Sequence, residues 1–214
     1  MLFSTIVITF AGVILFRQIS NGIYRDKLNG STAQAQSLID YDQGLLDSTR
    51  YRTDIKLGKV LRDISAISEV ARTADSKDVV LLATPQMPNY VRMYETSSNR
   101  LLLTSIPKEF RAAVRKANGV ESRRLVVTYE NGKKKDAFVV GKTIVIPTDH
   151  LYEIYYVFPL VEQNKLIALI QNLMLFTAIA LILLIGFITG LVIRRIALPV
   201  RQAADRKSTR LNSS

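Results

Sequence analysis

The sequence predicts a membrane protein in which two transmembrane helices flank one extracytoplasmic α+β domain. Leu173 to Ile193 is an uncharged apolar run, and about 20 apolar residues match the roughly 30 Å hydrocarbon core of a bilayer. Met1 to Phe16 is a second uncharged apolar segment. A buried core helix would be shorter and would show amphipathic spacing, so the pattern favours a transmembrane helix at Leu173–Ile193.

These apolar segments set the expected boundaries of the chain's parts. We predict transmembrane helix 1 at residues 1–19, the extracytoplasmic domain at 20–172 and transmembrane helix 2 at 173–193. The first segment is short for a span, so we expect its natural start to lie upstream of Met1. A cleaved signal peptide is the alternative, but the segment lacks a leading basic region and a small-residue cleavage site.

Charge and composition narrow the function classes. The formal net charge is +11, but part of the excess follows the apolar run as Arg194, Arg195 and Arg201, which anchor a cytoplasmic end by the positive-inside rule. Nucleic-acid binding is therefore disfavoured, and membrane lipid is the expected partner. The absence of Cys excludes disulfides and thiolate sites, and a single His argues against multi-histidine metal sites. We expect a multi-pass protein of the plasma membrane, with no metal or cofactor in these residues.

The first part of the domain is compatible with helix. Apolar residues recur at helical spacing from Arg17 to Thr73, and Gly30 and Gly44 interrupt the pattern only weakly. We predict one long helix that leaves the membrane and a second that packs back on it. An acidic group in the first helix could hold a cation, but a solvated helix face is favoured over that site: Asp40, Asp42 and Asp47.

Beyond Asp78 the pattern changes from helical to alternating. Pro107 to Ala117 predicts a short helix, with Pro in its first turn and basic residues in its last. Asn131-Gly132 is the strongest hairpin signal in the chain. The predicted strands are Asp78–Thr84, Tyr90–Tyr94, Arg123–Glu130, Asp136–Ile146 and Leu151–Phe158, the last with Tyr152, Ile154, Tyr156 and Phe158 on one face.

Two smaller features have a functional and an ordinary interpretation. Lys133, Lys134 and Lys135 lie at the hairpin tip, where they could contact anionic lipid headgroups or envelope polymers. A solvated turn is the simpler interpretation and the favoured one. His150 lies in a turn without a second histidine or a catalytic partner, so we interpret it as a loop residue.

Two patterns near the second span predict how a signal crosses the membrane. Gly186 and Gly190 are four residues apart, a spacing that lets helices approach closely in lipid, although ordinary glycine content explains it too. Small residues of the first span, Thr9, Ala11 and Gly12, could face this pair. After the span, Ile196, Val200 and Ala203 have the i, i+4, i+7 spacing of a helix that pairs with others.

A family resemblance follows from these segments. Two spans around an α+β domain, then Arg194-Arg195 and a helix with an early Pro199, resemble the input half of a sensor histidine kinase that enters its HAMP relay domain. Leu151–Leu160 and Arg194–Ala204 are similar to the MtrB-type kinases of actinobacteria. This implies a PAS/Cache-like sensor domain, a HAMP start at 194–204 and a homodimer.

The resemblance also implies an output that these residues do not contain. Such kinases use ATP and Mg in a separate kinase core and phosphorylate a cognate response regulator, and no catalytic residue carries over to any position here. His150 falls on the outer side of the membrane. The alternative is the input half of another receptor with the same layout, a chemoreceptor or a cyclic-dinucleotide enzyme.

The last ten residues have a separate explanation. Residues 205–214 read as the translation of a common sequencing-library adapter, so we expect them not to be native and to make no packed contacts. A polar, Ser-rich linker is the alternative. A HAMP helix should continue with apolar residues at heptad spacing, and Leu211 is the only large apolar residue in this tail.

Overall fold

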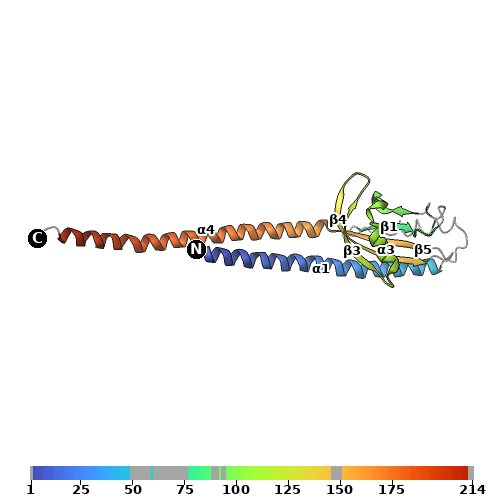
Figure 1. The fold of residues 1–214 in the computed structure, drawn as a ribbon, viewed down its shortest axis with the longest axis horizontal. Coiled ribbons are helices and arrows are strands. Elements are labelled where there is room, and N and C mark those ends of the chain that lie inside the picture. The colour runs from blue at the N-terminus through green and yellow to red at the C-terminus, as the bar shows by residue number, and fades with distance from the viewer. Residues whose placement is uncertain are drawn as a thin grey trace. The chain divides into compact units, whose positions relative to one another are not determined.

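The computed structural model describes residues 2–48, 59, 77–87, 92, 95–145 and 151–211 of the chain. It divides into two compact units, Ile23–Asn164 and the pair of segments Met1–Gly22 and Lys165–Ser214. The elements in Figure 1 are α1 (Leu2–Ser48), β1 (Asp78–Ala83), β2 (Thr96–Ser97), α3 (Lys108–Lys116), β3 (Glu121–Thr128), β4 (Lys134–Val145), β5 (Leu151–Pro159), α4 (Val161–Leu211) and two short 3-10 turns, η2 (Ser98–Arg100) and η3 (Leu103–Ser105).

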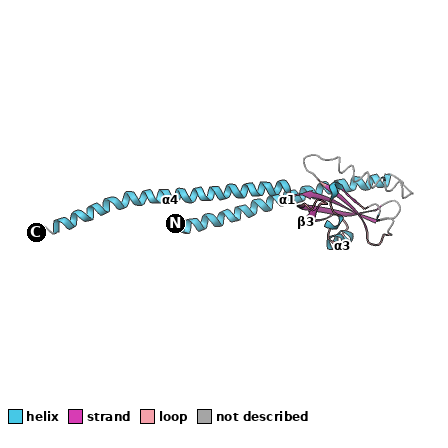
Figure 2. Ribbon diagram, turned by 90° about the horizontal axis from the view of Figure 1, so that it is seen from above, coloured by secondary structure: helices cyan, strands magenta, loops and turns pink. Residues whose placement is uncertain are grey.

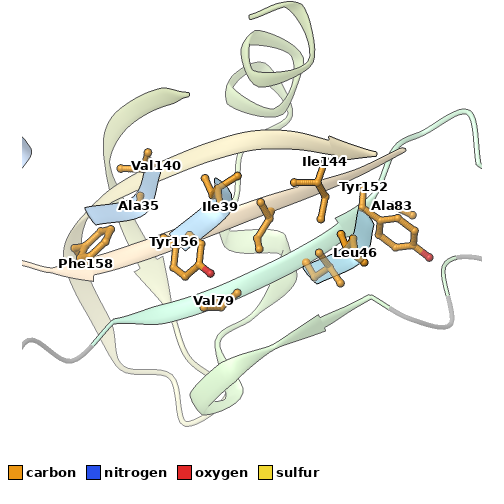
Figure 3. Close-up of a cluster of buried hydrophobic side chains, with 12 residues drawn as sticks. Ala35, Ile39, Leu46, Val79, Ala83, Val140, Ile144, Tyr152, Tyr156 and Phe158 are labelled. Atoms are coloured by element: carbon orange, nitrogen blue, oxygen red, sulfur yellow. The ribbon is translucent and has the colours of Figure 1, made fainter. Parts of the chain in front are cut away.

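The unit Ile23–Asn164 is built on one five-stranded sheet in the order β2-β1-β5-β4-β3, with every neighbouring pair antiparallel. Figure 2 shows α1 and α3 on opposite sides of this sheet. On one side, Ala35, Ile39 and Leu46 of α1 join the buried cluster of Figure 3. On the other, Phe110 and Val114 of α3 join a second buried cluster. The α+β architecture predicted from the sequence is confirmed for this unit.

Strand β5 is the middle strand, and both of its faces are covered. Tyr152, Ile154, Tyr156 and Phe158 lie on the α1 side, as predicted. The alternate residues are buried as well, because α3 covers their side of the sheet. The strand is therefore a fully enclosed element rather than an amphipathic one.

The hairpin and the short helix have the predicted local causes. The backbone N–H of Gly132 donates to the Tyr129 carbonyl at 2.9 Å, and Gly132 has φ of 75°, which a residue without a Cβ adopts at no steric cost. Helix α3 follows Pro107 and ends at Lys116, and it buries residues one turn apart. Both predictions are confirmed.

Helix α1 runs unbroken past Gly30 and Gly44. Its buried residues Ala35, Ile39 and Leu46 lie on the sheet, and this tertiary packing outweighs the cost of about 1 kcal/mol for a glycine within a helix. The second helix predicted before Thr73 and the strand predicted at Tyr90–Tyr94 lie largely outside the described residues, as does His150.

The other unit contains the apolar helices. Among the described residues, Val161–Arg195 of α4 is the one segment long and apolar enough to cross a membrane, and none of it is buried. The predicted second span, 173–193, lies inside it. The predicted first span forms the start of α1, where Ile6 and Phe10 are exposed by 59% and 68%.

Candidate functional site

The residues predicted to relay a signal all lie on α4. Arg194 and Arg195 are exposed on this helix, and the backbone stays helical through the positions of Arg201 and of the predicted relay residues, Ile196, Pro199, Val200 and Ala203. The helix continues to Leu211, so the backbone of most of the tail is helical.

The two glycines of the predicted packing face have open space around them. A Cβ added at Gly186 or Gly190 would meet no other heavy atom within 4 Å. Gly12 of α1 lies beside a different part of α4 from the one predicted. A Cβ added at Gly12 would lie 3.9 Å from Met174 Cε. Met174 precedes Gly186 by about 18 Å of helix, so Gly12 does not lie level with the glycine pair.

The strongest candidate site lies on β5, at Glu153. The side chain of Glu153 is completely buried, and each of its carboxylate oxygens accepts a hydrogen bond from a different arginine of α3. Arg111 Nε lies 2.6 Å from Oε2, and Arg115 Nη1 lies 2.6 Å from Oε1. The two arginines are four residues apart, so they project from one face of α3 toward the strand.

Further contacts complete this group, which we call the Glu153 cluster: Glu153, Arg111, Arg115 and Tyr155. Arg111 Nη2 donates to the carbonyl of Ala83 on β1 at 2.8 Å, and the Tyr155 hydroxyl donates to Glu153 Oε2 at 2.8 Å. Burial and the neighbouring Glu153 carboxylate raise the pKa of Tyr155, so its hydroxyl stays a donor at neutral pH. The cluster therefore ties α3 to both β5 and β1.

Gly141 makes room for this cluster. It is paired with Tyr155 across β4 and β5, and a Cβ at this position would come within 2.5 Å of the Tyr155 ring. That separation is too short for any side-chain carbon. Only glycine lets the ring lie over β4 while its hydroxyl reaches Glu153.

A second buried carboxylate lies on the other side of the same strand. Asp42 of α1 is 2% exposed and accepts a hydrogen bond from the Tyr156 hydroxyl. Burial raises the pKa of Asp42 to about 6, although the Tyr156 hydroxyl and the charge of Lys77 act in the opposite direction. The solvated face predicted for the acidic group is therefore wrong at Asp42, because α1 turns this position toward the sheet.

A third buried carboxylate, on β1, accepts hydrogen bonds from two side chains that lie outside the strands. Asp78 of β1 accepts hydrogen bonds from the Tyr129 hydroxyl at 2.6 Å and from the side-chain amide of Asn99. The hairpin tip is more exposed: Lys133 and Lys134 are exposed, whereas Lys135 lies 4.6 Å from the centre of the Tyr129 ring. Lys133 therefore fits the solvated turn, whereas Lys134 is exposed on β4 and Lys135 is partly covered on the same strand.

Glu153 and Asp42 differ in how far neighbouring groups compensate their negative charge. Within the described residues, no group of three or more His, Cys, Asp or Glu side chains could hold a metal ion. Glu153 has its charge compensated by two guanidinium groups, whereas Asp42 has one hydroxyl donor and a neighbouring ammonium group. Both carboxylates are attached to β5, directly or through Tyr156.

Sequence reasoning missed Glu153 and assigned Asp42 to a solvated face, although signals for both buried positions exist. Glu153 is the one charged residue inside the apolar run Leu151–Phe158. Asp42 falls into the 4-3-4 spacing of Ala35, Ile39 and Leu46, where a core residue is expected. A polar residue at a core position marks either a paired charge or a functional group.

Comparison with known proteins gives only distant similarities. No family model and no curated protein matches the chain. The periplasmic sensory domain of the Campylobacter jejuni chemoreceptor Tlp1 matches with a TM-score of 0.44 and 13% identity, over 74% of this chain and 64% of that one. The sensory domain of the Campylobacter jejuni chemoreceptor Tlp3 (CcmL), with isoleucine bound, matches with a TM-score of 0.41 and 12% identity, over 70% and 66%. This chain thus covers less than two thirds of each.

Proposed function

We propose that this chain is the input half of a transmembrane sensor histidine kinase, with Ile23–Asn164 as a PAS/Cache-like sensor domain outside the cell membrane. One observation carries the proposal. The middle strand of the sheet, β5, is joined through the single residue Leu160 to α4, which contains the segment able to span a membrane.

The packing around β5 explains how it could report a signal. Glu153 links this strand to α3, and Tyr156 links it to α1, so β5 cannot shift without changing one of these contacts. A ligand shifts a protein between two conformations by binding one of them more tightly than the other. A signal that alters the α1 or α3 contacts therefore biases the position of β5 and of the start of α4.

The orientation follows from charge. Arg194, Arg195 and Arg201 lie close together after the span and favour the cytoplasm, which leaves the sheet domain outside. We expect an alkaline phosphatase fusion at Asn99 to be active and a fusion at Ala204 to be inactive. The reverse pattern would contradict the proposal.

The kinase output rests on the resemblance of Leu151–Leu160 and Arg194–Ala204 to MtrB-type kinases. In this proposal Ile196, Val200 and Ala203 form the HAMP seam of a homodimer, and ATP, Mg and the response regulator act at a kinase core beyond these residues. The genomic DNA after the codon for Ala204 tests this part. A dimerisation helix with a phosphoacceptor histidine supports a kinase, whereas a chemoreceptor signalling hairpin or a cyclic-dinucleotide domain supports the alternative receptor.

The glycine face of α4 completes the proposed relay. Gly186 and Gly190 have open space in the single chain and are available to a second helix. Because the chain has no cysteine, single cysteines placed along residues 173–193 can be cross-linked in membranes without background. We expect cross-linking to recur every three to four residues and to change in the double variant Gly186→Ile, Gly190→Ile. Cross-linking without a helical period would exclude this packing face.

A further inference from the structure

Asp42 occupies a core position of α1. It falls between Ile39 and Leu46, which are buried in the cluster of Figure 3, and its own exposure is only 2%. Its carboxylate accepts a hydrogen bond from the hydroxyl of Tyr156, which points out of β5 toward α1. A carboxylate enclosed in this way is a costly choice for a core position, since its charged form loses hydration.

Among the described residues, the groups around Asp42 compensate its charge only in part. Lys77, which precedes β1 and is 6% exposed, contributes an attractive charge, and Tyr156 contributes a neutral donor. Lys142 of β4 lies 3.2 Å from Asp40, which precedes Asp42 by two residues and lies on the exposed side of α1. Tyr152, the remaining polar residue of β5 on this side, is fully buried in the same cluster.

We propose that Asp42 is a proton-binding site through which the sheet domain senses mild acidification outside the membrane. This inference rests on the proposed function for its sensing role, but the binding of the proton does not. The step takes one proton from solvent and converts the Asp42 carboxylate into a neutral carboxylic acid. No other group changes its charge.

Protonation changes the contacts on the α1 side of β5. The ionised carboxylate attracts the Lys77 ammonium group, and the neutral acid does not, so buried Lys77 loses a charge partner. The bond to Tyr156 also weakens, because a hydroxyl bonds a carboxylate more strongly than a carboxylic acid. Both changes act where α1 meets β1 and β5, and β5 leads into α4.

The pKa of Asp42 lies in a pH range to which an extracytoplasmic domain can be exposed. Burial raises the pKa of Asp42 from 3.8 to about 6, so the site changes its occupancy between about pH 7 and pH 5. The folded state binds this proton more tightly than the unfolded state does. The contribution of Asp42 to stability therefore increases as the pH falls from about 7 to about 4.

The first test measures proton binding in the full chain in detergent. Urea unfolding at pH values from 7.5 to 4.5 should show a stability component that sets in near pH 6, grows toward lower pH and is absent from Asp42→Asn. Asp47→Asn is the matched control, because Asp47 is exposed on the same helix and should leave the component unchanged. Equal pH profiles for the wild type and Asp42→Asn would overturn the proposal.

A second variant keeps the test decisive if Asp42→Asn folds poorly. Tyr156→Phe removes the donor that favours the ionised carboxylate, so the pH at which the stability component sets in should rise. An onset that stays in place or moves to lower pH contradicts the assigned geometry.

The sensing step has its own readout. The pattern of cross-linked positions within residues 173–193 should differ between pH 7.5 and pH 5 in membranes once the yields at each pH are scaled to one reference position, because acid lowers the thiolate fraction at every position. Asp42→Asn should remove the difference in pattern. A scaled pattern that does not depend on pH would overturn the sensing role. Reversed phosphatase fusions would instead reject the proposed topology and leave the proton titration standing, so the two failures are distinguishable.

Discussion

Two carboxylates on opposite sides of β5 are equally buried but differ in how their charge is balanced. Glu153 receives one guanidinium group on each oxygen, both at 2.6 Å. Asp42 receives a tyrosine hydroxyl and the more diffuse attraction of Lys77. Burial alone therefore does not decide what a carboxylate does. The number and charge of its hydrogen-bond donors decide its role. It serves either as a fixed tie, meaning a carboxylate that stays ionised and links two elements, or as a group that titrates.

The largest effect should come from removing the charge of Glu153. Glu153→Gln leaves Arg111 and Arg115 without their shared partner, and we expect a loss of about 3 kcal/mol in the free energy of unfolding. Urea unfolding of the full chain in detergent, followed by circular dichroism, measures this. Glu109→Gln is the control, since Glu109 is exposed on the same helix. A loss below about 1 kcal/mol would show that the cluster is not a fixed tie.

The space that Gly141 leaves for the Tyr155 ring gives the next effect. Gly141→Ala places a carbon within 2.5 Å of that ring, so the strand pair or the ring must move. We expect a loss of about 2 kcal/mol from this overpacking. Gly119→Ala serves as the control, because a Cβ there meets nothing within 4 Å. Equal stabilities of the two variants would contradict the close approach.

The two arginines should differ from each other. Arg111 bonds both Glu153 and the Ala83 carbonyl, whereas Arg115 contributes a single bond to Glu153. We expect Arg111→Gln to cost about 2 kcal/mol and Arg115→Gln about 1 kcal/mol. The same unfolding assay compares them. The opposite order would place the main tie at the C-terminal end of α3.

The smallest effect should come from Asp42→Asn at pH 7.5. The ionised carboxylate is already costly there, since its pKa is raised to about 6 by burial, and asparagine keeps an acceptor for Tyr156 without the charge. We expect stability to change by less than about 1 kcal/mol. A loss as large as that of Glu153→Gln would show that both carboxylates are fixed ties and would remove the contrast between them.

The elements with a local cause can be predicted from the sequence. The apolar run at Leu173–Ile193, the turn at Asn131-Gly132 and the helix after Pro107 each carry their signal within a few residues, and the structure has an apolar helix, a hairpin and a helix at these places. The alternation in β5 correctly predicted which residues share its α1 side. These features follow from side-chain spacing and backbone preference, which need no distant contact.

Which polar residues are buried, and with which partners, depends on long-range packing. Glu153 meets Arg111 and Arg115 across 42 and 38 positions of the chain, and Asp42 meets Tyr156 across 114. No local pattern specifies such pairs, because they depend on which helix covers which side of the sheet. The donors, burial and pKa of each carboxylate come from that arrangement, and so does the difference between a fixed tie and a group that titrates.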